Sequence, residues 1–361
     1  MTDMDPWKLG LSLHGQRYDY KELLQYSSQQ IVSSETNTWE KEIFRFIINW
    51  LSDSPHIIQF SSGTTGKPKE IRLSKESMMQ SARNTCSFLN LQNGMNALLC
   101  MPTDYIAGKM MIVRSFVCGM NLLITEPKSL PDIMAPTSVD FCAMVPMQVL
   151  NLLTCMIDLH PIKTLLVGGA EISAELERLL QGVTTRTYAT YGMAETSSHI
   201  ALRLLNSPAT EKSYTAMPGV ELSMDERGCL VIQAKYLPGK VISNDLVEIT
   251  GKNSFKWIGR FDNLINSGGV KIVPEEVEVL IMEKSMLECV ALGIPDSKLG
   301  EKLVFVFEKE QVHSSLPKLL SDLETFLPRR WKPKKIILVD LFPRNDAMKI
   351  DRRRLLEYVN Q

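Results

Sequence analysis

The chain has 361 residues, of which 44% are hydrophobic and 22% charged, as is ordinary for a soluble globular protein. This length exceeds what one compact core usually holds, so two or three domains are expected. The net charge of −1 provides no strongly basic surface, which argues against nucleic acid or an acidic membrane as a partner.

The cysteines, the histidines and the apolar segments indicate which kinds of site and which location to expect. The seven cysteines form no Cys-x-x-Cys pair and the five histidines are scattered, so neither a zinc site nor a disulfide framework is expected. The first residues are acidic and lack the apolar core of a signal peptide. The apolar stretch 110–124 is interrupted by Arg114, Gly119 and Asn121, so it predicts no membrane span. We therefore expect a cytoplasmic protein.

From residue 56 to about 192, short apolar runs alternate with helical patterns. The runs predict strands at 56–60, 96–101, 121–125, 164–167 and 185–188. The patterns between them predict helices at 74–90, 108–118, 146–156 and 173–180. This alternation predicts an α/β fold whose large N-terminal domain has a largely parallel sheet covered by helices.

The pattern changes twice in the second half of the chain. Residues 215–258 predict short strands and turns, which indicates a small β-rich appendage. Beyond residue 260, the expected elements form a small α+β domain: a helix at 274–282, strands at 288–292 and 303–307, a helix at 315–326 and a strand at 335–339. We expect a large domain over residues 1–260 and a small domain over residues 263–361.

A loop rich in hydroxyls, glycines and lysines follows the first predicted strand: Ser61, Ser62, Gly63, Thr64, Thr65, Gly66, Lys67, Pro68 and Lys69. Glycines let a backbone approach a polyanion, hydroxyls and backbone N–H groups donate hydrogen bonds, and lysines offset negative charge. The loop is not the common P-loop, because only two residues separate its glycines. It predicts a phosphate-binding loop, although a plain flexible connection can have the same composition.

Three further positions suit a nucleotide, although each also has an ordinary structural interpretation. The run Tyr191-Gly192-Met193-Ala194-Glu195-Thr196 places an aromatic ring beside a carboxylate, which suits a base and a divalent ion but also an ordinary turn after a strand. Asp245 could accept ribose hydroxyls or belong to a turn. Lys349 could serve a site or be a solvated charge in a basic tail.

Taken in order, these pieces resemble the AMP-forming acyl/aryl-CoA ligase superfamily over nearly the whole chain. The stretches that carry the resemblance are SSGTTGKPK (61–69), VGGAEIS (167–173), YGMAET (191–196), SNDLVEI (243–249), GRFDNLINSGGVKIVPEEVE (259–278) and AMKIDR (347–352). The resemblance implies two half-reactions in one site. ATP and a carboxylate first give an acyl-adenylate and pyrophosphate, and the thiol of coenzyme A then displaces AMP.

The resemblance also implies roles for individual residues. Residues Ser61 to Lys67 would hold the β- and γ-phosphates of ATP, and Glu195 would hold Mg²⁺. Lys349 would bridge the carboxylate and the α-phosphate, because a cation placed there stabilises the charge that builds in the transition state. The adenine and ribose would contact Gly169, Ala170, Tyr191, Asp245 and Arg260.

The small domain is expected to be mobile in this superfamily. Asp262 would be the hinge, at 261–262, about which the small domain turns between the two half-reactions. Gly268 and Gly269 would border the tunnel for the pantetheine arm of coenzyme A, where missing side chains leave room.

Within the superfamily, the chain resembles the short o-succinylbenzoate–CoA ligases of menaquinone biosynthesis, since only about 55 residues precede the phosphate loop. That substrate has two carboxylates, so its pocket needs a cation or a good donor for the carboxylate that does not react. The candidates are Lys109, at a predicted helix start where it could also be simply solvated, and the polar trio Ser197, Ser198 and His199; Gly192 of the tyrosine motif would also line the acyl site.

Other interpretations stay open at this point. The chain could be another aryl- or acyl-CoA ligase, an adenylation enzyme that loads a carrier protein, or a nucleotide-binding protein that has lost catalysis. It departs from the superfamily's usual residues at Glu70, Tyr105, Ala194 and Ser243-Asn244, and in the turn 345–348, which leaves room for slow turnover or an unusual substrate.

Overall fold

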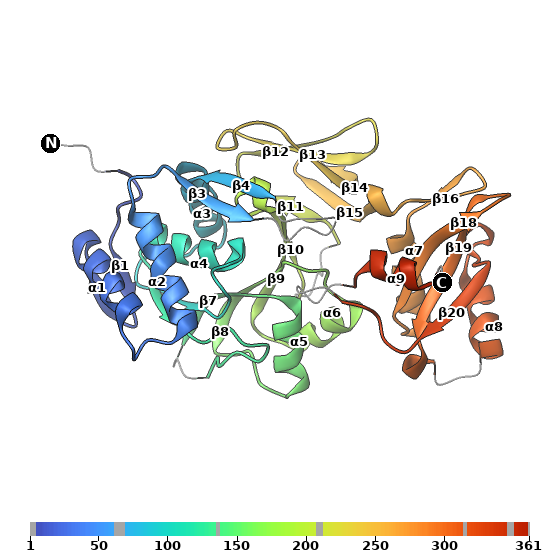
Figure 1. Ribbon diagram of the computed structural model, residues 1–361, viewed down its shortest axis with the longest axis horizontal. Coiled ribbons are helices and arrows are strands. Elements are labelled where there is room, and N and C mark those ends of the chain that lie inside the picture. The colour runs from blue at the N-terminus through green and yellow to red at the C-terminus, as the bar shows by residue number, and fades with distance from the viewer. Residues whose placement is uncertain are drawn as a thin grey trace. The chain divides into compact units, whose positions relative to one another are not determined.

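The computed structural model of the protein describes residues 5–60, 69–134, 138–206, 212–312, 316–344 and 350–359 (Figure 1). It confirms the predicted α/β class, because sheets and helices both occur throughout the described chain. None of the helices in the described part is both long and apolar enough to cross a membrane.

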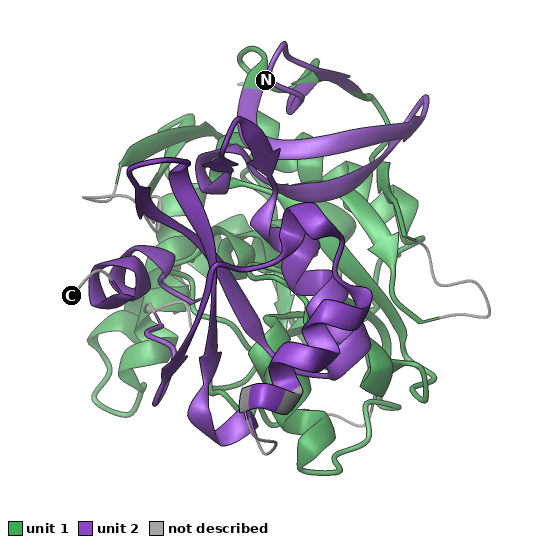
Figure 2. Cartoon of the chain, turned by 90° about the vertical axis from the view of Figure 1, so that its right-hand side faces the viewer, with its two compact units in different colours: residues 1–221, 233–241 green, residues 222–232, 242–361 purple. Residues whose placement is uncertain are grey.

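The chain forms two compact units (Figure 2). The first contains residues 1–221 and 233–241, and the second contains residues 222–232 and 242–361. The predicted domain boundary after residue 260 and the predicted hinge at 261–262 both fall inside the second unit, and both stay predictions.

The first unit is built around a mixed sheet with a parallel centre. Its strands run in the order β11-β10-β9-β8-β7-β5-β6-β1-β2; the strands from β9 to β1 are parallel to one another, and β10 and β2 pair antiparallel at either end of this group. The strands of this sheet are β1 (Leu11–Leu13), β2 (Gln16–Tyr18), β5 (Asn96–Leu99), β6 (Asn121–Ile124), β7 (Val139–Met144), β8 (Ile162–Val167), β9 (Arg186–Gly192), β10 (His199–Leu204) and β11 (Tyr214–Ala216). Strand β7 was not predicted; almost all of its residues are buried, so it lacks the alternation that marks a half-exposed strand.

Helices supply the apolar faces that cover this sheet. They are α1 (Tyr20–Val32), α2 (Thr38–Leu51), α3 (Lys75–Phe88), α4 (Ile106–Cys118), α5 (Pro146–Thr154) and α6 (Ala174–Leu180). Helix α3 begins where the sequence predicts, because the Ser74 hydroxyl caps it by accepting from the Ser77 N–H. Side chains of α5 and α6, such as Leu152 and Leu180, pack with Cys142 and Leu165 of the central strands in one buried cluster.

The first predicted strand does not join the parallel sheet. Strand β3 (His56–Phe60) pairs antiparallel with β4 (Glu70–Ser74) in a separate two-stranded sheet, with Phe60 opposite Glu70. The phosphate-loop sequence thus connects the two strands of a hairpin. The sequence pattern did not predict this hairpin, because β4 is a short strand with only one buried residue.

The second unit contains most of the predicted β-rich segment, except residues 215–221 and 233–241, together with the small α+β fold. Its strands are β12 (Val220–Met224), β13 (Cys229–Ala234), β14 (Val241–Gly251), β15 (Ser254–Arg260), β16 (Ile265–Ser267), β17 (Val270–Ile272), β18 (Cys289–Asp296), β19 (Gly300–Glu308) and β20 (Lys335–Val339), the first three of which include residues of the first unit at one end. Its helices are α7 (Pro274–Ser285), α8 (Leu316–Phe326) and α9 (Arg352–Val359). Strands β12 to β15 follow one another in order, and a separate sheet has the order β17-β16-β19-β18 with β20 beside β19.

Strands β14 and β15 belong to the same unit as the C-terminal elements because α7 packs on β15. The carboxylate of Glu275 on α7 lies against Gly259, where an added Cβ would meet it at 2.5 Å. Glu275 also accepts a hydrogen bond from Asn263 at 2.5 Å. The superfamily-like stretch 259–278 is therefore one packed piece of structure.

Candidate active site

The residues predicted for adenine binding follow neighbouring parallel strands of the first unit. Gly169 and Ala170 come after β8, and Tyr191 lies near the end of β9. The pairing of Val167 with Ala189 places these strand ends side by side. Ligands of open α/β sheets commonly bind outside the carboxyl ends of the strands, so this edge is a suitable place for a base.

Two glycines give this edge its shape. Gly169 has a φ of +84°, a left-handed conformation that glycine adopts without strain. At Gly168, a Cβ would lie 1.8 Å from the Thr190 Oγ1, so the Thr190 side chain occupies the space that a side chain at position 168 would need.

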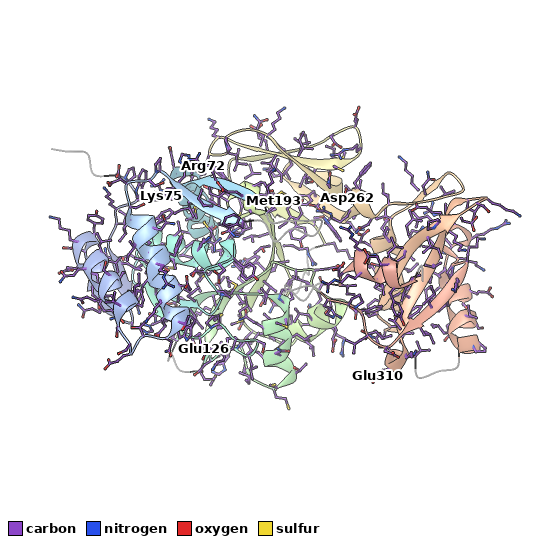
Figure 3. All side chains as sticks on the ribbon, viewed as in Figure 1. Arg72, Lys75, Glu126, Met193, Asp262 and Glu310 are labelled. Carbon is purple, nitrogen blue, oxygen red and sulfur yellow. The ribbon has the colours of Figure 1, made fainter. Side chains whose placement is uncertain are left out.

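Glu195 lies in a short 3₁₀ turn (Ala194–Thr196) directly after β9, next to Met193, which Figure 3 labels. The Thr196 hydroxyl holds this turn by donating to Ser198 O at 2.6 Å and accepting from Met193 N at 3.1 Å. Thr196 is thus buried in the turn while Glu195 is exposed. No cluster of three metal-ligating side chains occurs among the described residues. A single exposed carboxylate still fits Mg²⁺, which commonly takes one or two carboxylates together with phosphates and water.

Strands β9 and β10 are in close contact at Gly192. A Cβ at this position would lie 2.4 Å from both His199 Cα and Ser198 O. The predicted acyl-site residues Gly192, Ser198 and His199 are therefore brought together, and Gly192 is required there for a steric reason.

A buried arginine lies against these same residues. Arg114 on α4 is only 2% exposed, and its Nη2 donates to Ser198 Oγ at 2.7 Å and lies 3.3 Å from His199 Nδ1. Its Nε is buried without a hydrogen-bond partner, and no carboxylate in the described part of the chain forms an ion pair with it. A buried cation usually has such a partner, so this guanidinium is a candidate for binding an anion.

The neighbouring histidine is held neutral. Burial and the charge of Arg114 keep the pKa of His199 well below its usual range. The Thr85 hydroxyl donates to Ser81 O at 3.0 Å and lies 3.0 Å from His199 Nε2, which assigns the ring proton to Nε2 and leaves Nδ1 to accept from Arg114. Burial lowers the pKa of Arg114 to about 10, so the guanidinium is charged at neutral pH.

Lys109 lies five residues before Arg114 on the same helix, and its contacts differ from those of a solvated lysine. Its Nζ donates to Gln59 Oε1 at 2.6 Å, and the Gln59 amide donates to Asp104 O at 3.0 Å. Burial lowers the pKa of Lys109. This lysine thus joins α4 to β3, next to the phosphate-loop sequence.

In the second unit, the residues predicted for ribose binding and for the hinge form one network. Asp245 on β14 is opposite Arg260 on β15, and its Oδ1 accepts from Trp257 Nε1 at 3.3 Å and from Arg260 Nη1 at 3.4 Å. The Nη2 of Arg260 donates to Asp262 at 2.9 Å, and Asn244 Nδ2 also reaches Asp262, at 3.2 Å. The Asn244 that departs from the superfamily pattern thus contacts the predicted hinge residue.

Gly268 and Gly269 form the turn between β16 and β17. Their φ angles are +61° and +82°, as a tight two-residue hairpin requires at both central positions. A Cβ at Gly269 would meet nothing within 4 Å, whereas one at Gly268 would lie 3.2 Å from the Leu299 side chain. The hairpin accounts for both glycines, and their predicted place beside a pantetheine tunnel stays a prediction.

Comparison with known proteins decides the family. The model of the AMP-binding enzyme family matches residues 15–234. The chain belongs to the AMP-binding enzyme family. It is 34% identical to an acyl-CoA synthetase (AMP-forming)/AMP-acid ligase II-like protein from Dyadobacter fermentans DSM 18053 whose crystal structure is known. The structural alignment covers 93% of this chain and 98% of the Dyadobacter chain, with a TM-score of 0.62.

Two further relatives carry more specific names. A 2-succinylbenzoate–CoA ligase from Bacillus cereus is 25% identical over 100% of this chain and 81% of its own length. The structure of o-succinylbenzoate coenzyme A synthetase from Bacillus subtilis, in complex with ATP and magnesium ion, has a TM-score of 0.76 at 17% identity and covers 96% of each chain, which shows a shared fold. The protein is accordingly an AMP-forming acyl-CoA ligase.

Two of the residue sets predicted for this ligase lie outside the described residues. These are the phosphate-loop residues Ser61 to Lys67 and the lysine Lys349. Their roles stay predictions, as do those of the placed residues.

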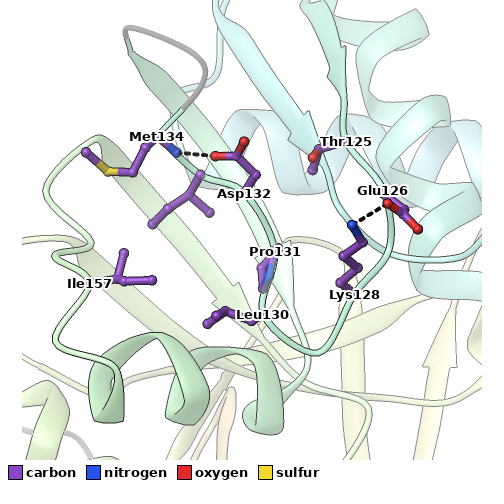
Figure 4. Close-up of a pocket in the computed structure, with 9 residues that line it drawn as sticks. Thr125, Glu126, Lys128, Leu130, Pro131, Asp132, Met134 and Ile157 are labelled. Carbon is purple, nitrogen blue, oxygen red and sulfur yellow. Dashed lines mark hydrogen bonds and ion pairs between the residues drawn. The ribbon is translucent and has the colours of Figure 1, made fainter.

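A cavity of about 430 Å³ lies elsewhere in the first unit, on the crossover that follows β6 (Figure 4). Leu130, Met134 and Ile157 line it together with an ion pair between Lys128 and Glu126. None of the predicted site residues in the described part of the chain lines this cavity, so we assign it no part in the ligase reaction.

Sequence reasoning missed Arg114 and Thr85. In the sequence, Arg114 is visible only as a charge that interrupts an apolar stretch. That charge was itself the available signal, because an arginine on a helix with apolar residues on every side must be buried with a partner.

Proposed function

We propose that this ligase activates o-succinylbenzoate with ATP and Mg²⁺ and transfers the acyl group to coenzyme A. In the first half-reaction, a carboxylate oxygen attacks the α-phosphorus of ATP and pyrophosphate leaves. In the second, the thiol of coenzyme A attacks the acyl carbon, AMP leaves and the thioester forms. The Bacillus cereus relative bears the name of this activity, which supports the proposal.

The observation that carries the choice of substrate is the buried Arg114. A dicarboxylate substrate has one carboxylate that reacts and one that does not, and the second must be bound in a desolvated pocket. The guanidinium beside Ser198 and His199 would supply the charge, and the Ser198 hydroxyl would supply a further donor. A ligase for a fatty or simple aromatic acid has no use for an unpaired cation there, since its desolvation costs stability.

The remaining roles follow the chemistry of the first half-reaction. The carboxylate and the triphosphate are both anions, so Lys349 would bring them together and stabilise the charge on the pentavalent phosphorus. Glu195 would hold Mg²⁺, which when bound neutralises phosphate charge and orients the leaving pyrophosphate. The adenine would lie against Tyr191 and the Gly169–Ala170 backbone, and the ribose hydroxyls would contact Asp245.

Pyrophosphate release in the presence of four acids tests this function. The acids are o-succinylbenzoate, benzoate, 4-coumarate and a medium-chain fatty acid, each assayed with ATP and Mg²⁺, with and without coenzyme A. Release that depends on o-succinylbenzoate, with a coenzyme A thioester as product, supports the proposal. Activity on a monocarboxylate alone would support the ligase activity and reject o-succinylbenzoate as the substrate.

A further inference from the structure

The ring of Tyr191, to which we assign the adenine, packs against a second tyrosine. Tyr191 on β9 and Tyr214 on β11 have ring centroids 5.8 Å apart, with the ring planes tilted by 58°. Strand β10 lies between them, and its Ala201 pairs with Tyr191 on one side and with Ala216 on the other. Because residues two apart on a strand share a face, both rings lie on one face of the sheet, across the small side chain of Ala201.

Tyr214 is itself held by groups other than the first ring. The guanidinium carbon of Arg203 on β10 lies 5.5 Å from the Tyr214 ring centroid, and Arg203 Nη2 donates to the carboxylate of Glu177 on α6. The Arg203 side chain is only 13% exposed. The Tyr214 ring also packs against the buried cluster that contains Leu180 and Leu205. A cation, an ion pair to a helix and the apolar core therefore fix this ring in place.

A charge on the segment after β8 also acts on Tyr214. Burial raises the pKa of the Tyr214 hydroxyl, the charge of Arg203 opposes this shift, and the carboxylates of Glu177 and Glu171 raise the pKa further. Glu171 comes two residues after Gly169, in the segment assigned to the adenine together with the end of β9. One residue of β11 is thus close to both parts of the edge to which we assign the base.

We propose that Tyr214 is the positioning residue that holds the Tyr191 ring in the orientation that binds the adenine of ATP. The inference rests on the role proposed above for Tyr191. A side chain that is immobilised only when a ligand binds loses conformational freedom at that moment, and this loss weakens the binding. A ring that is already held in the free protein avoids this loss. Tyr214 should therefore affect nucleotide binding and leave acid binding unchanged.

Binding of AMP, measured by isothermal titration calorimetry, tests this inference. In Tyr214→Leu, we expect the Kd for AMP to rise by ~5-fold, as for the loss of an aromatic pair. Tyr214→Phe keeps the ring and should bind AMP as the unmodified protein does. Tyr18→Leu is the matched control, because it breaks another tyrosine pair of the first unit, in which the Tyr18 and Tyr26 ring centroids are 4.8 Å apart. This control should leave the Kd for AMP unchanged.

Two further measurements separate positioning from a general loss of structure. In steady-state kinetics of Tyr214→Leu, the KM for ATP should rise by ~5-fold, while kcat and the KM for the carboxylic acid should be largely kept. In a Tyr191→Leu background, Tyr214→Leu should have no additional effect on the Kd for AMP, because Tyr214 acts through that ring. Tyr214→Met, whose flexible side chain fills more of the space, repeats the comparison if Tyr214→Leu does not fold.

The outcomes of the AMP titration distinguish this inference from the proposed function. An unchanged Kd for AMP in Tyr214→Leu, or an equal rise with and without the Tyr191 ring, would overturn the inference. Unchanged AMP binding in Tyr191→Leu would show that Tyr191 does not contact the adenine, and the inference would fail with that assignment. Because AMP binding needs no acid, the titration decides the role of Tyr214 even if the acid assay rejects o-succinylbenzoate.

Discussion

The guanidinium of Arg114 donates to the hydroxyl of Ser198 at 2.7 Å, and this contact joins helix α4 to the start of β10. The residue after Ser198 is His199, which is neutral and accepts from the same guanidinium. The pair therefore provides one full positive charge with only neutral partners in the described chain. Such an arrangement is costly in the free protein and suits an anionic ligand.

Replacing the charge should therefore lower function and spare stability. In Arg114→Met, we expect the KM for o-succinylbenzoate to rise by ~10²-fold, since a buried charge-assisted pair is typically worth about 1.5–3 kcal/mol. The melting temperature should stay the same or rise, because methionine fills the space without a buried unsatisfied Nε. Steady-state kinetics with a monocarboxylate analogue provide the control, and an equal rise in both KM values would reject the role.

The same kinetics distinguish Lys109 from Arg114. Because Lys109 donates to Gln59 in the absence of substrate, Lys109→Met should raise the KM for the dicarboxylate less than Arg114→Met does. A larger effect at Lys109 would indicate that Lys109, as predicted from the sequence, binds the second carboxylate of the substrate.

Lys349→Ala should separate the two half-reactions. Adenylate formation should fall by ~10²-fold or more, by analogy with other groups that stabilise transition-state charge. Thioester formation from supplied acyl-adenylate should be largely kept, because this step attacks the acyl carbon and forms no pentavalent phosphorus. Single-turnover assays of each step measure this, and an equal loss in both steps would contradict the assigned role.

Gly192→Ala tests the close approach of β9 and β10. The new Cβ would meet the backbone of Ser198 and His199 at 2.4 Å, so the two strands must shift. We expect the free energy of unfolding to fall by about 1–3 kcal/mol, as for other overpacked sites. Gly182→Ala is the matched control, since a Cβ there meets nothing within 4 Å and unfolding should be little changed.

Lys75 gives the first unit a measurable pH dependence of stability. This lysine, labelled in Figure 3, is buried with its Nζ 5.1 Å from the Trp7 ring and 2.8 Å from Ser52 O. Burial lowers its pKa to about 8 from its ordinary 10.5. Between these values the unfolded chain binds more protons than the folded one, so Lys75 should make stability rise with pH from about 8 to 10.

Denaturant unfolding at several pH values measures this effect against Lys75→Met. The difference in the free energy of unfolding between the two proteins should be constant below pH 8. Above pH 8, the free energy of unfolding of the unmodified protein should rise relative to that of Lys75→Met. A difference that stays constant to pH 10 would show that Lys75 keeps its ordinary pKa when folded.

Local signals predicted much of the fold. The apolar runs predicted β5, β6, β8 and β9, and the helical pattern at 74–90 predicted α3, whose N-cap is Ser74. Strand β7 was missed because a fully buried strand lacks alternation. The pairing of β3 was mistaken because a hairpin and a crossover begin with the same strand and loop and differ only in the element after the loop.

The contacts that give the candidate site its chemistry are mostly long-range. Arg114 and Ser198 are 84 residues apart, and Arg203 and Glu177 are 26 apart, so no motif links them. Sequence motifs identified the segments that we propose to contact a nucleotide. The partners that set the charge and position of those segments depend on tertiary packing, which local patterns do not encode.

The most direct test of the proposed substrate compares two acids with the unmodified protein. We predict that kcat/KM for o-succinylbenzoate exceeds that for its analogue without the second carboxylate by at least ~10²-fold, because a site built to bind a polar group rejects a ligand that lacks it. Equal values, or a preference for the monocarboxylate, would contradict the assignment of Arg114 and of the dicarboxylate substrate.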